Sequence, residues 1–108
     1  MSIYPGSTPT HFFDLPVDVS KMKDIEITYA QNDKVVLVKH LKDGTVQGKE
    51  FILDLTQEDT FLFDKNISTV QIQVRLLDGN DKVHPSELMF VPLKKCLSKE
   101  VLGDAAES

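Results

Sequence analysis

The sequence has few of the residues that mark metal, disulfide-rich or membrane proteins. Among its 108 residues there is no tryptophan, one cysteine and three histidines. Cys96 has no cysteine partner for an internal disulfide and is compatible with a reducing compartment. His11, His40 and His84 stand far apart and match no metal-ligand spacing. We therefore expect surface or strand-edge histidines and no metal site.

Long apolar runs and clustered basic residues are also missing. No segment is apolar over the length that crosses a bilayer, and the opening MSIYPGSTP has no secretory pattern. We expect synthesis in the cytoplasm. A net charge of −5, spread along the chain, disfavours binding to nucleic acid or to an anionic membrane.

No catalytic motif occurs. There is no GxSxG, and the glycines do not form a phosphate-binding loop before a helix. Lys94 and Lys95 favour the thiolate of Cys96, but no histidine is near in sequence, so a half-buried cysteine at a strand end is the preferred interpretation. The acidic residues that invite an acid–base hypothesis fall on an outer strand face or at a helix start: Glu50, Asp54, Glu58 and Asp59. We predict no enzyme, no catalytic residue and no cofactor.

The clearest pattern that is present lies between Thr69 and Leu93. Its first part alternates apolar and polar residues, which predicts a strand with one buried and one wet face. The residues expected inside are Val70, Ile72, Val74 and Leu76, and those expected outside are Gln71, Gln73 and Arg75. Residues 78–81 predict a turn, because Gly and Asn tolerate positive φ. A second strand is expected to return over residues 88–93, completing a long β-hairpin.

Further strands are expected over residues 11–15, 24–31, 34–41 and 50–55. Phe12 and Phe13 cannot both face inward on a regular strand. Thr56 predicts the cap of about one helical turn, with Phe61 to Phe63 closing the core. We divide the chain into an extended lead-in (1–10), a β-sandwich domain (11–97) and a tail (98–108), with a brief turn at 98–102 and disorder from Gly103.

Strands that recur at short spacing with little helical periodicity indicate an all-β fold. We predict an antiparallel immunoglobulin-like β-sandwich of about seven strands with one short helical turn, and a small closed barrel is the competing fold.

Several strands carry apolar residues on the face opposite the expected core. Val36, Val38 and Ile52 belong to this outer set, and Leu88 and Phe90 join it if Met89 and Val91 point inward. Together they form a candidate protein–protein interface. The competing interpretations are a misread register and coverage by loops.

Five segments of the chain, in this order, resemble a known group of proteins: GSTPTHFFDLP, IEITYAQNDKVVL, LDLTQEDTFLF, VQIQVRLLDG and KEVL. The group consists of short prophage-encoded immunoglobulin-like proteins of Gram-positive bacteria, similar to the N-terminal domain of phage baseplate upper proteins. LTQEDT followed by VQIQVR is the most specific part. The sequence departs from the group at His84-Pro85 and continues past KEVL.

The resemblance implies a non-enzymatic structural or assembly protein of a phage tail or baseplate. The virion is then a later location open to it, because lysis releases proteins without a signal. Its partners would be other tail or baseplate proteins or further copies of itself, and no catalytic residue is implied. The alternative is a recognition module that binds a carbohydrate or a host-surface ligand, which rests on analogy of fold. Sugar sites usually present aromatic side chains, whereas Tyr29 is expected inside and Tyr4 lies in the lead-in.

Overall fold

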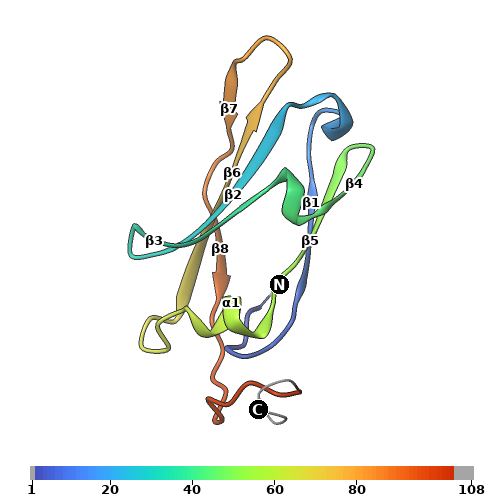
Figure 1. Ribbon diagram of the computed structural model, residues 1–108. Coiled ribbons are helices and arrows are strands. Elements are labelled where there is room, and N and C mark those ends of the chain that lie inside the picture. Colours follow the sequence, from blue (N-terminus) through green and yellow to red (C-terminus); the bar gives the residue numbers. More distant parts are fainter. Residues whose placement is uncertain (1, 104–108) are drawn as a thin grey trace.

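Two antiparallel sheets make up the protein, as seen in a computed structural model that describes residues 2–103 (Figure 1). The elements are β1 (Thr10–Asp14), η1 (Val19–Lys21), β2 (Asp24–Gln31), β3 (Lys34–His40), η2 (Leu41–Asp43), β4 (Thr45–Gln47), β5 (Glu50–Asp54), α1 (Gln57–Phe61), β6 (Thr69–Leu77), β7 (Val83–Pro85) and β8 (Met89–Pro92). One sheet has the order β1-β5-β4, and the other has the order β3-β2-β6-β7 with β8 also paired to β6.

This architecture confirms the predicted immunoglobulin-like sandwich, with eight strands where about seven were expected. β4 and β7 lie outside the expected strand ranges. β4 forms a hairpin with β5 through Gly48, whose φ of +60° a side chain disfavours. Both sheets end in free edge strands, whereas a closed barrel has no edges.

The predicted hairpin of residues 69–93 is present, and β6 lies at its centre beside β2. The alternation is as expected, because Val70, Ile72, Val74 and Leu76 are all buried. The turn differs in one detail: positive φ falls on Asp81. The returning strand pairs with β6 first as β7 and then, after residues 86–88, as β8 with the register shifted by one. That extra residue is a β-bulge, the usual means of bending an edge strand.

A second bulge overturns the expected placement of Val36. Asn32 and Asp33 turn the β2–β3 hairpin with positive φ, as predicted. Tyr29 lies opposite Leu37, but Ala30 lies opposite Val35, so Val36 is the extra residue. Because of the bulge, Val36 packs against the core and does not lie on the outer face as expected.

The predicted helical turn is α1, and Thr56 caps it. Thr56 accepts a hydrogen bond from the Asp59 backbone N–H, and the Asp59 carboxylate accepts one from the Thr56 N–H. Lys39 reaches Asp59 from β3 and forms an ion pair of 3.1 Å with it. Phe63 is buried at this end of the core, but Leu62 is exposed, so the expected closure by all three residues is wrong for Leu62.

Both ends of the described chain lie near α1 (Figure 1). Ile3 is fully buried and forms a parallel bridge with Leu93. The helical turn expected at residues 98–102 is not formed. Instead, the Gln57 side chain exchanges two hydrogen bonds with the backbone of Leu102, at 3.1 and 2.7 Å. Residues 104–108 of the predicted tail lie outside the described residues.

Candidate interaction surfaces

His11 lies in the core, which corrects the expectation of a surface histidine. His11 and Phe13 are two residues apart on β1, so both side chains point inward, and His11 is only 1% exposed. His11 Nδ1 and the Tyr29 hydroxyl form a hydrogen bond of 2.6 Å, while Nε2 has no partner among the described residues. Burial lowers the pKa of His11 and raises the pKa of Tyr29, since the interior disfavours both charged forms. The pair is therefore neutral and joins the two sheets.

The other two histidines match the expectation. His40 ends the edge strand β3 and contacts Asp24, and His84 is exposed on β7 and contacts Asp78. Among residues 2–103, no three His, Cys, Asp or Glu side chains gather as metal ligands do. Cys96 is exposed beyond the end of β8, and not half-buried as predicted.

The five candidate interface residues do not form one patch. Val38 is exposed on the outer face of β3, and Ile52 is half-buried on the outer face of the other sheet. Val36 packs inward, as described above. Leu88 and Phe90 are exposed at the opposite edge of the larger sheet from Val38, with β2 and β6 between.

A groove lined mainly by apolar residues lies on the open side of the sandwich, and we call it the β1–β8 groove. It has a volume of about 600 Å³ and separates the edge of one sheet from the edge of the other. Ile72 and Val74 lie at its base. Its remaining lining is formed by Phe12, Phe13, Asp14, Leu15, Pro16, Ser86, Glu87, Met89, Phe90 and Val91.

Three side chains of this groove are apolar and well exposed. Phe12 is 57% exposed, Phe90 63% and Met89 39%. Met89 belongs to the inner face by register, opposite Ile72, yet it is exposed because no strand covers it beyond β8. Of these residues, Phe90 was in the predicted set. The sequence contains a signal for Phe12: Phe12 and Phe13 are neighbours, and only one of the two rings can face the core on a regular strand.

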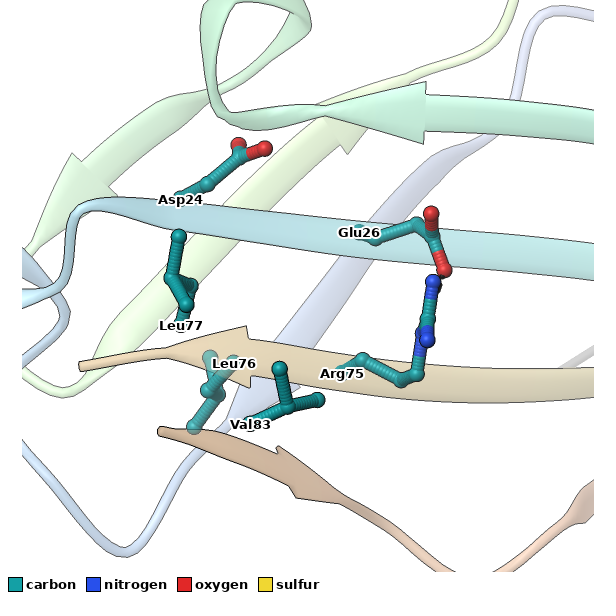
Figure 2. Close-up of a pocket in the computed structure, with 6 residues that line it drawn as sticks. All are labelled: Asp24, Glu26, Arg75, Leu76, Leu77 and Val83. Carbon is teal, nitrogen blue, oxygen red and sulfur yellow. Dashed lines mark hydrogen bonds and ion pairs between the residues drawn. The ribbon is translucent and has the colours of Figure 1, made fainter. Parts of the chain in front are cut away.

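A smaller pocket of about 160 Å³ lies over the ends of β2, β6 and β7 (Figure 2). Glu26 extends from β2 towards Arg75 on β6, and the carboxylate accepts a hydrogen bond of 2.7 Å from Nε of Arg75. This hydrogen bond lowers the pKa of Glu26 and raises the pKa of Arg75. The two charged groups are thus engaged with each other on the wet outer face, as the polar alternation of β6 predicted.

Comparisons with known proteins do not identify a family for this chain. No family model matches the chain, and no curated protein matches it. Among solved structures, the chain is similar to the immunoglobulin-like domain of mouse leukocyte-associated immunoglobulin-like receptor 1, solved as a strand-swapped dimer. The identity is 10% and the TM-score 0.48, over 89% of this chain and 86% of that one.

None of the helices in the described residues has the length and apolar character needed to cross a membrane.

Proposed function

We propose that this protein is a non-enzymatic structural or assembly protein of a phage tail or baseplate that works through protein–protein contacts. The β1–β8 groove is the observation that carries the proposal. Isolated surface apolar residues are common, but a groove bordered by three exposed apolar residues over an apolar base is typical of a contact surface. The five sequence segments that resemble prophage tail-region proteins direct the proposal to a phage particle.

The arrangement of side chains favours contact over chemistry. The groove's polar side chains include Asp14 and Glu87, which flank apolar residues at the sheet edges. The buried His11–Tyr29 pair does not line this groove. A surface of this kind supports binding through apolar contact with a charged border.

The test uses a lysogen whose prophage encodes this chain. The chain is tagged, the prophage is induced, and particles and tail intermediates are separated by sedimentation. We expect the protein to sediment with tails or with tail intermediates. Phe90→Asp should reduce that association at least tenfold, because it places a charge on the rim of the groove.

Val35→Asp is the matched control. Val35 is 64% exposed, like Phe90, but it lies at the other edge of the same sheet and outside the β1–β8 groove. It should leave the association unchanged. A protein absent from every tail fraction, together with normal tails after deletion of its gene, would contradict the proposed function.

The second candidate, a carbohydrate or host-surface recognition module, has one observation in its favour. Phe12 and Phe90 are exposed aromatic residues on the two strands that border the groove, which Asp14 and Glu87 also line. Sugars stack on aromatic rings while their hydroxyls donate to carboxylates. A glycan array would decide: selective binding that Phe90→Asp abolishes supports this candidate, and an array without signal rejects it.

A further inference from the structure

The free edge of β1 carries the inference. Within residues 2–103, β1 is paired on one side only, with β5. The Leu15 N–H donates to the Lys49 carbonyl and the Leu55 N–H donates to the Pro9 carbonyl. Because hydrogen-bonded pairs alternate in an antiparallel ladder, residues 9, 11, 13 and 15 use their backbone groups towards β5. The backbone groups of Thr10, Phe12 and Asp14 therefore point away from β5, to the free edge, and all three residues are exposed.

The other sheet edges carry features that discourage pairing, and β1 carries none of them. The edge strand β3 holds a bulge and a lysine, Lys39, turned inward to Asp59. The opposite edge is broken by the bulge at residues 86–88, contains Pro85 and Pro92, and is covered beside Pro92 by Ile3. β4 is only three residues long. β1 is a regular five-residue strand without proline, lysine or bulge.

We propose that β1 pairs antiparallel with β1 of a second copy of this chain, centred on Phe12, and joins the two smaller sheets into one of six strands. Centring on Phe12 places Phe12 opposite Phe12 and Thr10 opposite Asp14. All three outward residues then form hydrogen-bonded pairs within the strand. A shift by two residues in one direction brings Pro16, which has no N–H, opposite Thr10, and so loses a donor.

Side chains and charges fit the same register. Each exposed Phe12 ring gains an aromatic neighbour on the outer face, the kind of cross-strand pair that stabilises sheets. Asp14 faces Thr10, whose hydroxyl donates to Asp54 of its own chain, and not a second Asp14. On the inner side, the β1–β8 grooves of the two copies come together beneath the shared strands, because this twofold axis is perpendicular to the sheet.

This inference rests on the proposed function, since it names a second copy as a partner at the same groove. Both copies carry a net charge of −5, so we expect the dimer to strengthen when salt is raised. The dimer is measured by sedimentation velocity of the purified full chain over a range of concentrations at moderate and high salt. The expected result is a concentration-dependent change from the mass of one chain to that of two.

Charge variants at Phe12 test the register. Phe12→Lys and Phe12→Glu each place like charges opposite one another and should abolish the dimer, whereas an equimolar mixture of the two should restore it. Val35→Lys is the control at a comparably exposed apolar residue on another edge, and it should leave the dimer intact. Thermal melts establish that each variant is folded.

Hydrogen exchange gives a readout that side-chain changes do not disturb. When the wild-type protein is concentrated, exchange should slow at the amides of Thr10, Phe12 and Asp14, while those of His11 and Phe13 keep the protection that β5 already provides. A wild-type chain that stays monomeric at millimolar concentration and high salt overturns the inference. So does a dimer that survives both Phe12 variants.

The same variants keep the two proposals distinguishable. A monomeric wild-type chain that still sediments with tails overturns the β1 pairing and supports the proposed function. A dimer restored by the mixed variants, in a protein that never associates with tails, supports the pairing and overturns the proposed function.

Discussion

At the scale of single residues, His11 and Tyr29 form the least expected contact. Both are buried, and they meet across the interior from different sheets through a bond of 2.6 Å. His11 also packs edge-on against Phe13, with ring centroids 6.3 Å apart. A buried polar pair costs little while both partners are bonded, but it is costly when one partner is removed.

A double-mutant cycle tests this coupling. We expect Tyr29→Phe and His11→Leu each to lower the free energy of unfolding by about 1–3 kcal/mol, because each leaves a buried polar atom unpaired. The double variant should lose less than the sum of the two, because it removes both polar atoms. Urea unfolding of the four proteins measures the cycle. Simple additivity would show that the hydrogen bond does not couple the two side chains.

The titration of His11 gives a second prediction. Burial lowers the pKa of His11 in the folded state, whereas the pKa of a histidine in an unfolded chain is about 6.5. As the pH falls below that value, the unfolded chain binds a proton that the folded chain does not, so the free energy of unfolding decreases. The loss is at most about 1.4 kcal/mol per pH unit. Between pH 6.5 and 5, the free energy of unfolding of His11→Leu should fall less steeply with pH than that of the wild-type protein. Identical slopes would show that the titration of His11 does not cause the loss.

At the scale of elements, the register of β6 decides which of its residues tolerate charge. Val74 is buried opposite Ile27, whereas Gln73 lies on the outer face and donates to the Ser86 carbonyl at 3.0 Å. Val74→Asp should cost more than about 4 kcal/mol and unfold the domain, because it buries an unpaired carboxylate. Gln73→Asp should cost about 1 kcal/mol through the lost hydrogen bond. Thermal melts compare the two, and a reversed order would place β6 one residue out of register.

The bulges explain where reading by alternation succeeds and where it fails. β2, β5 and β6 pair regularly with one another or with β1, and their inward residues follow a strict period of two. β3 and the β7–β8 edge each contain one extra residue, so alternation carried through them places side chains on the wrong face. Val36 is the result in β3.

At the scale of the whole molecule, the N-terminal segment completes the larger sheet. Ile3 is fully buried, its N–H donates to the Pro92 carbonyl at 3.0 Å, and its carbonyl accepts from the Lys94 N–H at 2.7 Å. This segment therefore covers the edge of β8 beside Pro92 and leaves the edge near Phe90 open. Nothing local marks Ile3, since one isoleucine among polar and proline residues shows no periodicity.

Ile3→Asp should lower the free energy of unfolding by about 3–4 kcal/mol, because it places a charge in the core and weakens the docking of the segment. Tyr4→Asp is the neighbouring control. Tyr4 is 49% exposed, so we expect a change below about 1 kcal/mol. Urea unfolding measures both. Equal effects of the two variants would show that docking of the segment as a whole, and not burial of Ile3, is what matters.

The amino-acid sequence by itself determined the fold class, the central hairpin, the capped turn at Thr56 and the inward face of β6. These depend on local period, turn chemistry and capping, which act between residues close in the chain. The tertiary structure decided the burial of His11, the inward packing of Val36, the docking of Ile3 and the β1–β8 groove. Each of these depends on which strands become neighbours and which edges stay free, and those relations join residues far apart in sequence. The free edge of β1 is one of them, because only the order of strands in a sheet leaves an edge without a partner.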